Sequence, residues 1–326
     1  MDWFIATDEA GYGPKLGPLV IAATLWQPVS GAPRRPPAEL FQSLLSGFEL
    51  DSGKQLLFAD SKKLFHQGSE KSLRCLEYPL LAALRQKRSA EVPADLRSLC
   101  RVLAPNDVPL LEAQPWYLQA EQPFPLDARG PAEAPDQWSR IDAWMARAEV
   151  RLNRIATRVI DVPQFNEGCA RCGNKATLLS ETTIRLVADT LERLDHQGQV
   201  EIGCDRHGGR AKYGAILQHI FPEASLSILG ENAQQSRYEL RRGGLTMRWS
   251  FTVGGDAFVP TALASIAAKY LRERLMNDWN AYWQKACGGG LRPTAGYPLD
   301  AARFLRDIEP TRRRLGIDLP QLVRQR

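Results

Sequence analysis

Short apolar runs alternate along this chain with longer segments of helical periodicity. Near the N-terminus, two apolar runs at residues 4–7 and 19–26 are separated by a turn rich in glycine and proline at residues 11–18. The second run is almost continuously apolar, as in a strand that is covered on both faces. The pattern therefore predicts two adjacent strands joined by a loop.

Both patterns, short apolar runs and apolar residues at helical spacing, recur further along the chain. Short apolar runs predict strands at residues 154–162, 200–204, 226–229 and 245–253. Apolar residues three or four positions apart predict helices at residues 40–45, 73–84, 174–194, 212–220, 261–283 and 298–306, and a further helix through Ile141, Trp144, Met145, Ala148 and Leu152. Strands that alternate with helices place the chain in the α/β class, with a mixed sheet flanked by helices.

One stretch breaks this regularity. Eight prolines fall between Pro93 and Pro135, and periodicity is weak there. A loop this long is normally functional, disordered or an inserted lobe. We therefore interpret residues 85–136 as an insertion in a single domain that spans residues 1–326, with a helical C-terminal part from residue 257. Within the insertion, we expect Trp116 and Tyr117 to pack locally rather than to stack on a base.

Composition limits the class of protein. The 326 residues are 44% hydrophobic and 24% charged, and the mean hydropathy is −0.31. These values are typical of a soluble globular protein. No run approaches the ~20 consecutive apolar residues of a membrane span, and the N-terminus lacks the basic region of a signal peptide. We therefore expect a cytoplasmic protein without a membrane partner.

The charge of the chain is unevenly distributed. The net charge is +5, yet residues 232–326 contain sixteen Lys or Arg against eight Asp or Glu, a local charge of +8. A basic C-terminal third suits a polyanionic partner such as nucleic acid. A solvated arginine-rich surface is the alternative that charge alone leaves open.

The six cysteines are too few for a disulfide scaffold in a chain of this length. Cys169 and Cys172, taken with Cys204 and His207, have a spacing that zinc sites also show. Cys204 follows an apolar run, however, and such a position favours a small buried residue of a strand. We expect no required zinc, although spacing alone leaves that alternative open.

Acidic residues follow three of the predicted strands. They are Asp8 and Glu9, Asp205, and Asp256. Ligands of open α/β sheets gather just beyond strand ends, and carboxylates that converge there need a hard divalent cation to offset their repulsion. Two such ions about 4 Å apart can position a water and stabilise the leaving oxygen of a phosphodiester. Ordinary turn and cap chemistry is the alternative.

Five ordered blocks resemble the type 2 ribonucleases H, that is, ribonucleases HII and HIII. DEAGYGPKLGPLVIAA, which starts at Asp8, is similar to the opening motif, and DSKKL at residues 60–64 is similar to the second block. Asp205 matches the third acidic position. GGDAFVPTALASIAAKYLRERLM, at residues 254–276, is similar to the fourth block, and GYP at residues 296–298 lies where the family has Gly-Tyr. The order extends from residue 5 to about residue 305 and is interrupted by the insertion.

The resemblance implies a ribonuclease H-like sheet and a metal-dependent endoribonuclease. The implied substrate is the RNA strand of an RNA/DNA hybrid, or a ribonucleotide embedded in duplex DNA, with 3′-hydroxyl and 5′-phosphate products. The implied catalytic acids, which hold two Mg2+ or Mn2+ ions, are Asp8, Glu9, Asp205 and Asp256. The implied substrate-binding residues, by the 2′-hydroxyl or by phosphates, are Gly11, Tyr12, Gly13, Tyr297, Lys62, Lys63, Lys269 and Arg272.

Three features leave alternatives open. Tyr12 stands where ribonuclease HII usually has Arg and HIII usually has Lys, so a requirement for a ribonucleotide–deoxyribonucleotide junction is undecided. Two further alternatives concern substrate contacts: Tyr297 is a core residue instead of a substrate contact, and Lys269 pairs with a carboxylate instead of a phosphate. Residues 165–179 are similar to an asparagine-rich block of HIII, whose separate N-terminal substrate-binding domain we do not expect here. An inactive nucleic-acid-binding relative and a DNA-directed nuclease of related fold are the competing functions; no required protein partner is evident.

Overall fold

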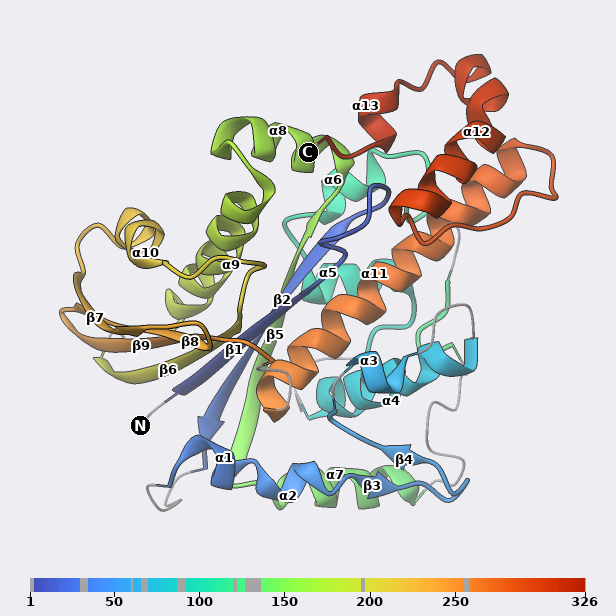
Figure 1. Cartoon of the computed structure of the whole chain (residues 1–326). Helices are drawn as coiled ribbons and strands as arrows, with labels where there is room; N and C mark the ends of the chain where they lie inside the picture. The colour runs from blue at the N-terminus through green and yellow to red at the C-terminus, as the bar shows by residue number, and fades with distance from the viewer. Residues whose placement is uncertain are drawn as a thin grey trace.

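A seven-stranded mixed sheet forms the centre of the computed structural model (Figure 1). The structure describes residues 3–29, 35–59, 61–65, 70–86, 92–119, 122–126, 136–194, 197–254 and 258–325. The strand order is β5-β2-β1-β6-β9-β8-β7. In chain order the strands are β1 (Trp3–Ala10), β2 (Leu19–Pro28), β5 (Val150–Ile160), β6 (Gln197–Asp205), β7 (Ser225–Glu231), β8 (Gln235–Arg242) and β9 (Gly244–Thr252).

The direction of the strands changes within the sheet. β1, β2 and β5 pair antiparallel, whereas β1 pairs parallel with β6, and β6 pairs parallel with β9. β8 and β7 extend the sheet antiparallel beyond β9. A separate two-stranded sheet joins β3 (Phe48–Glu49) to β4 (Gln55–Leu56). Three parallel strands, β1, β6 and β9, therefore have their C-terminal ends at one edge.

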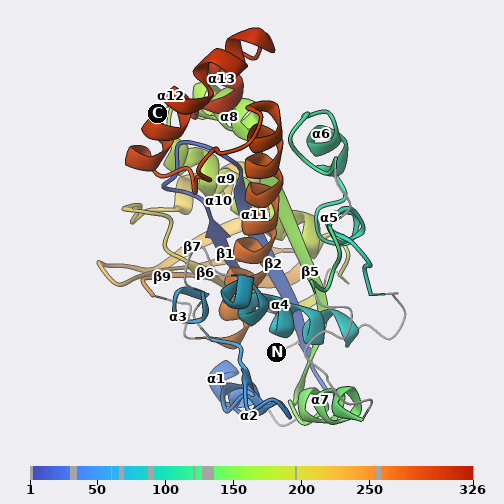
Figure 2. The ribbon, with the colours of Figure 1, turned by 90° about the vertical axis from the view of Figure 1, so that its right-hand side faces the viewer.

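Helices cover both faces of the sheet (Figures 1 and 2). One face carries the long helix α11 (Val259–Ala286), with α3 (Ser61–Leu64) and α4 (Glu70–Arg85) packed against it, and the other carries α8 (Val162–Cys172), α9 (Lys175–Leu191) and α10 (Gly214–Ile220). The remaining helices are α1 (Pro37–Leu40), α2 (Gln42–Leu45), α5 (Leu96–Leu103), α6 (Val108–Glu112), α7 (Gln137–Ala146), α12 (Pro298–Arg314) and α13 (Leu319–Leu322). The predicted mixed sheet flanked by helices, with a helical C-terminal region, is confirmed.

The sheet separates two hydrophobic cores. The core on the α11 side contains Phe4 and Val20, and the core on the α9 side contains Ile5 and Ile21. Neighbouring residues of one strand thus enter opposite cores, because successive strand side chains point to opposite faces. In the part of the chain that the structure describes, no helix is long and apolar enough to cross a bilayer.

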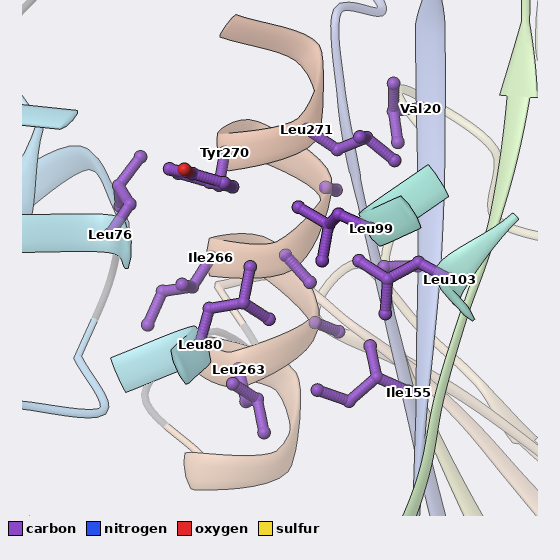
Figure 3. Close-up of a cluster of buried hydrophobic side chains, with 14 of the residues drawn as sticks. Val20, Leu76, Leu80, Leu99, Leu103, Ile155, Leu263, Ile266, Tyr270 and Leu271 are labelled. Carbon is purple, nitrogen blue, oxygen red and sulfur yellow. The ribbon is translucent and has the colours of Figure 1, made fainter. Parts of the chain in front are cut away.

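The sequence predicted little regular structure in the proline-rich stretch, but the structure has helices α5 and α6 there. α5 begins with a capping box in which Asp95 accepts a hydrogen bond from the Ser98 backbone at 2.6 Å. Leu99 and Leu103 of this helix belong to the α11-side core, near Ile155 of β5 (Figure 3). Trp116 and Tyr117 are 2% and 0% exposed, which confirms that they pack locally. Much of the stretch is therefore core.

Several other predicted boundaries are wrong. The helix expected to reach Leu152 ends at Ala146, and Leu152 lies in β5, which begins four residues earlier than predicted. β8, α8 and α13 were not predicted from the pattern. α12 continues to Arg314 rather than ending near residue 306, because its apolar residues Ala301, Phe304 and Ile308 keep helical spacing.

A buried polar network fixes the proline-rich stretch to the helices on the α11 face. Arg274 of α11 donates hydrogen bonds to the Gln122 side chain at 3.0 Å and to the Pro123 carbonyl at 2.8 Å. Its guanidinium lies 3.7 Å from the Glu77 carboxylate, and both side chains are fully buried. Glu77 also accepts hydrogen bonds from the Tyr270 hydroxyl and the Leu126 backbone. Burial raises the pKa of Glu77.

We predict that Arg274→Met destabilises the protein strongly. Methionine fills most of the volume but removes the positive charge beside the Glu77 carboxylate and the donor to the Pro123 carbonyl. The loss of one partner of a buried pair costs about 3–5 kcal/mol. Denaturant unfolding followed by tryptophan fluorescence measures the change. Glu77→Gln is the control: it keeps an acceptor for the Leu126 backbone, and it leaves the hydrogen bonds of Arg274 to Gln122 and Pro123 in place, so a smaller loss is expected. Equal losses in both variants would contradict this account.

Candidate active site

Asp8 and Asp205 lie at neighbouring positions of two parallel strands. β1 extends to Ala10, so Asp8 and Glu9 lie within the strand, not beyond its end as the pattern predicted. Thr7 pairs with Cys204, and Asp205 is the last residue of β6. Asp8 and Asp205 are the next residues of the two strands, so they lie side by side on strands that are about 4.8 Å apart. The parallel ends of β1 and β6 thus bring two predicted acids together.

The alternation of side chains places these two acids on one face. Ile5, Ile202 and Cys204 belong to the core on the α9 side. Asp8 is three residues from Ile5, and Asp205 is one residue from Cys204. An odd number of residues reverses the direction of a strand side chain, so both aspartates lie on the α11 face. Glu9 has the opposite parity and lies on the α9 side, where its charge adds to the effect of burial in raising the pKa of Tyr12. Cys204 is 2% exposed, as expected for a core residue.

The fourth predicted acid is outside the described residues. β9 ends at Thr252, which pairs with Asp205, and Asp256 follows four residues later in the chain. Within the described ranges, no group of three or more His, Cys, Asp or Glu side chains is arranged to hold a metal ion. The convergence of all four acids therefore stays a prediction. Carboxylate oxygens on one face are nevertheless the donors that Mg2+ and Mn2+ prefer.

The loop after β1 requires glycine at its first position. Gly11 has φ +88°, and a Cβ there would lie 2.5 Å from Nε of Arg272 and 2.6 Å from the Pro18 carbonyl oxygen. Both the positive φ and the close contacts exclude larger residues. Gly13 follows on the exposed side of the same loop. The chain therefore presents backbone, rather than side chain, next to the acids.

Tyr297 lies against this loop, although 283 residues separate it from Gly13 in the sequence. A Cβ on Gly13 would be 3.7 Å from the Tyr297 ring, and the ring side chain is 51% exposed. Gly296 fixes the approach, because its carbonyl accepts hydrogen bonds from the backbone of Lys15 at 2.7 Å and of Leu16 at 3.3 Å. The structure thus brings together the glycine loop and the tyrosine that the sequence pattern linked.

Arg324 supports the loop from below and was not predicted. The side chain is 3% exposed and donates hydrogen bonds to the Gly17 carbonyl at 2.6 and 3.0 Å and to the Gly11 carbonyl. Its guanidinium lies 4.6 Å from the centre of the Phe165 ring. Burial, and then the charge of Arg272, lowers its pKa to about 9. The last residues of the chain therefore hold the loop after the first strand.

Asn166 and Tyr117 complete this support. Asn166 donates hydrogen bonds to the carbonyls of Pro320 at 3.0 Å and Val323 at 2.9 Å, and so holds the segment that carries Arg324. Tyr117 donates a hydrogen bond to Asp161 at 3.0 Å. Burial raises the pKa of Asp161 to about 6, while nearby Arg324 opposes the shift. Through Tyr117, the proline-rich stretch therefore contacts Asp161, which lies near the Arg324 side chain that supports the glycine loop.

The predicted phosphate contacts occupy different environments. Arg272 is 3% exposed and donates a hydrogen bond to the Ala295 carbonyl at 2.9 Å, so it braces the chain before Tyr297. Lys269 lies 4.7 Å over the Phe65 ring. Lys62 and Lys63 belong to α3, and their side chains lie outside the described residues. A direct phosphate contact therefore remains a prediction for the lysines, whereas the burial of Arg272 favours a supporting role.

Tyr12 packs on the α9 side of the loop. The Lys175 ammonium lies 4.5 Å over the centre of its ring, and a Cβ on Gly208 would be 3.6 Å from its hydroxyl. Burial, followed by the charges of Glu9 and Cys169, raises the pKa of Tyr12, and Arg210 opposes them. Tyr12 thus connects the glycine loop with the start of α9 and with the turn after Asp205.

The cysteines and histidine of the zinc alternative have other partners. Cys172 donates a hydrogen bond to Glu181 at 3.0 Å, and burial together with that contact raises its pKa to about 11. His207 shares a hydrogen bond of 3.0 Å with the Ser180 hydroxyl, and burial lowers its pKa to about 3. The absence of a required zinc remains a prediction, which metal analysis of the purified protein can test.

A cavity of about 890 Å³ opens beside Tyr297. It lies between α11 and the segment before α12, and its lining includes Phe65, Asn277, Gln284, Arg292 and Tyr297. The cavity therefore begins at the residue that touches the glycine loop and continues along α11.

No protein-family model and no curated protein matches this sequence. Among solved structures, the chain is similar to Bst-RNase HIII in complex with Mn2+, with 16% identity and a TM-score of 0.41 over 99% of this chain and 65% of that one. It is also similar to ribonuclease H2 from Pyrococcus horikoshii OT3, with 14% identity and a TM-score of 0.41 over 98% of this chain and 92% of that one.

A third similar structure is RNase HII from Archaeoglobus fulgidus in its complex with PCNA. The identity is 14% and the TM-score 0.43, over 99% of this chain and 94% of that one. The chain therefore spans less than two thirds of the length of the HIII protein but most of the length of the two HII proteins.

We predict that Gly296→Ala is more harmful than Gly290→Ala. Both glycines have positive φ, +82° and +72°, but a Cβ on Gly296 would lie 2.5 Å from the Leu16 carbonyl oxygen, whereas Gly290 faces open space. The left-handed backbone costs about 1–2 kcal/mol in each variant, and the clash adds about 1–3 kcal/mol for Gly296. Unfolding free energies give the comparison, and equal losses would show that the Leu16 contact is unimportant.

Proposed function

We propose that this protein is a metal-dependent endoribonuclease. Its substrate is the RNA strand of RNA/DNA hybrids or a ribonucleotide embedded in duplex DNA, and its products end in 3′-hydroxyl and 5′-phosphate. The observation that carries the proposal is the placement of Asp8 and Asp205 on one face at adjacent parallel strand ends. The glycine loop that follows Asp8, with the Tyr297 ring beside Gly13, lies next to those acids.

Each part of the site has a role in this proposal. Asp8 and Asp205 would hold two Mg2+ or Mn2+ ions together with Asp256 and with Glu9, whose carboxylate starts on the opposite face and would have to reach the ions around the end of β1. Such ions supply an activated water and stabilise the leaving oxygen of a phosphodiester. The loop backbone from Gly11 to Gly13 approaches the ribose closely because it has no side chain at either end. Tyr297 packs its ring on the sugar and orients the strand through its hydroxyl.

Rigid support of the loop matters for this role. A hydrogen bond that distinguishes RNA from DNA must be aimed at a single 2′-hydroxyl. Arg324 holds the loop carbonyls from inside, and Gly296 holds Lys15 and Leu16 through their backbone N–H groups. The contacts that define the loop therefore come from the far end of the chain, which restricts its motion relative to Tyr297.

We predict that Asp8→Asn abolishes most cleavage while the duplex still binds. The change removes a charged ligand from the proposed metal site, so a loss of at least ~100-fold in kcat is expected, as for a major electrostatic element. Binding depends on phosphate contacts elsewhere. The measurements are cleavage of a hybrid duplex in Mg2+ and in Mn2+ and, separately, binding by fluorescence anisotropy.

Three results have distinct meanings. Wild-type rates in Asp8→Asn, or in excess EDTA, would place the chemistry elsewhere. Binding without cleavage by the unmodified protein would favour the inactive relative, and cleavage of all-DNA duplexes would favour the DNA-directed nuclease. Duplexes with one ribonucleotide, with four or more and with none distinguish these cases in one experiment.

Tyr297 should matter more for a single embedded ribonucleotide than for a long RNA tract. One ribonucleotide offers one 2′-hydroxyl and one junction, so every discriminating contact must form there, whereas a long tract offers many registers. Loss of the ring contact is expected to lower kcat/KM on the single-ribonucleotide duplex. By analogy with base stacking, the loss of transition-state binding free energy is about 1–3 kcal/mol. Tyr297→Phe and Tyr297→Ala, assayed on both duplexes, separate hydroxyl from ring. Equal losses on both substrates would assign Tyr297 a structural role.

A further inference from the structure

A polar face of the sheet adjoins the acid pair of Asp8 and Asp205. On the α11 side, the long helix packs mainly on β1 and β2, whereas β6, β9 and β8 continue the sheet away from it (Figure 1). The apolar residues of these three strands enter the α9-side core, so the residues between them point to the α11 side. None of those alternate residues is buried in the three strands, which the structure describes throughout. This surface, the outer face of β6, β9 and β8, is therefore open to a ligand.

The row of residues at the strand ends continues from Asp205 with neutral side chains. Asp205 of β6 pairs with Thr252 of β9, and Thr252 pairs with Gln235 of β8. The Gln235 amide donates a hydrogen bond to the Thr252 hydroxyl at 3.0 Å. Beyond Asp205, these paired residues therefore present polar groups without charge.

The next row inward is open and ends in a cation. Gly203 pairs with Ser250, and Ser250 pairs with Arg237 of β8. A Cβ on Gly203 would meet no atom within 4 Å, so the surface is flat and free there. With about 4.8 Å between strands and about 3.3 Å per residue, the backbones of Asp205 and Arg237 are about 12 Å apart. Arg237 thus shares a face with Asp205, across an unobstructed part of the sheet.

Arg237 differs from the other arginines of this face, which are held by acids. Arg248 lies 3.0 Å from Glu239 and 3.6 Å from Glu201, and Arg241 lies 2.6 Å from Glu239. Arg237 is exposed and makes no hydrogen bond or ion pair with any residue that the structure describes. The cation nearest to the row of Asp205 on this face is therefore the one whose charge is not offset.

We propose that Arg237 binds a backbone phosphate of the substrate on the outer face of β6, β9 and β8, close to the scissile phosphate. The inference rests on the proposed function, since it adds a contact to the same site. A guanidinium can donate two parallel hydrogen bonds to phosphate oxygens, and all the donors of Arg237 are free for this purpose. Gly203 leaves room for the strand between the acid pair and Arg237. The contact positions the strand without reading its sequence.

The salt dependence of binding tests this proposal. In an Asp8→Asn background, which is expected to prevent turnover, the affinity for a duplex with one embedded ribonucleotide is measured between about 50 and 200 mM salt. Arg237→Gln should weaken binding and lower the slope of log K against log salt by about 0.7–0.9, the value for one phosphate contact. Arg237→Lys keeps the charge and should keep the slope. Arg241→Gln is the matched control, because Arg241 lies on the same strand and face, farther from Asp205 and beside Glu239.

Chemical changes in the duplex locate the contacted phosphate. Single phosphates on either side of the ribonucleotide are replaced by uncharged methylphosphonates, one in each duplex. At the contacted phosphate, the replacement should weaken binding of the parent but have little further effect in Arg237→Gln, because both changes remove one contact. At other phosphates, the replacement should affect the parent and Arg237→Gln equally. Thermal unfolding of Arg237→Gln should match the parent, since Arg237 has no partner within the described residues.

The outcomes separate this inference from the proposed function. Equal slopes in Arg237→Gln and Arg241→Gln, while the unmodified protein cleaves the duplex, overturn the phosphate contact alone. The same holds if every methylphosphonate weakens the parent and Arg237→Gln equally, or if Arg237→Gln loses thermal stability together with binding. If the parent does not bind the duplex and the unmodified protein does not cleave it, the proposed function fails, and the phosphate contact fails with it.

Discussion

The parallel pairing of β1 with β6 is the constraint on which the site depends. A strand has period two, so a shift of one residue would move Asp8 to the other face of the sheet. Such a shift is opposed by burial, because Phe4 enters one core and Ile5 the other. Each such side chain contributes about 1.5–3 kcal/mol on full burial. The placement of Asp8 beside Asp205 is therefore set by apolar packing on both faces, not by the acids, which repel each other.

The loop after β1 depends on a different balance. Its carbonyls at Gly11 and Gly17 point inward, where an unpaired backbone acceptor would be costly. Arg324 satisfies them with a buried guanidinium whose desolvation is itself unfavourable. The contact is stabilising because one planar group reaches several carbonyls, while the Phe165 ring covers one face of that group. Removal of either partner would leave the other buried and unsatisfied, so the loop and the C-terminal segment are interdependent.

Strong periodicity made α9, α11 and the first two strands predictable from sequence. α5 has the same signal in Leu96, Leu99 and Leu103, but the surrounding prolines concealed it. β8 buries Tyr238 and Leu240 between charged residues, too few apolar positions for a recognisable strand. The resemblance to a known family predicted the loop and Tyr297 together. Nothing local distinguishes Arg324 from the other arginines of the tail, since its role in the loop comes from contacts with Gly17 and Gly11, which are 307 and 313 positions away.

The alternation of β1 divides the two acids of the first motif between the faces of the sheet. Asp8 lies with Asp205 on the α11 side, whereas Glu9 lies on the α9 side, where Tyr12 packs against the other core with the Lys175 ammonium 4.5 Å over its ring. Two carboxylates that are adjacent in the sequence therefore have different surroundings. They can serve one proposed metal site only where β1 ends, because both faces of the sheet are within reach there.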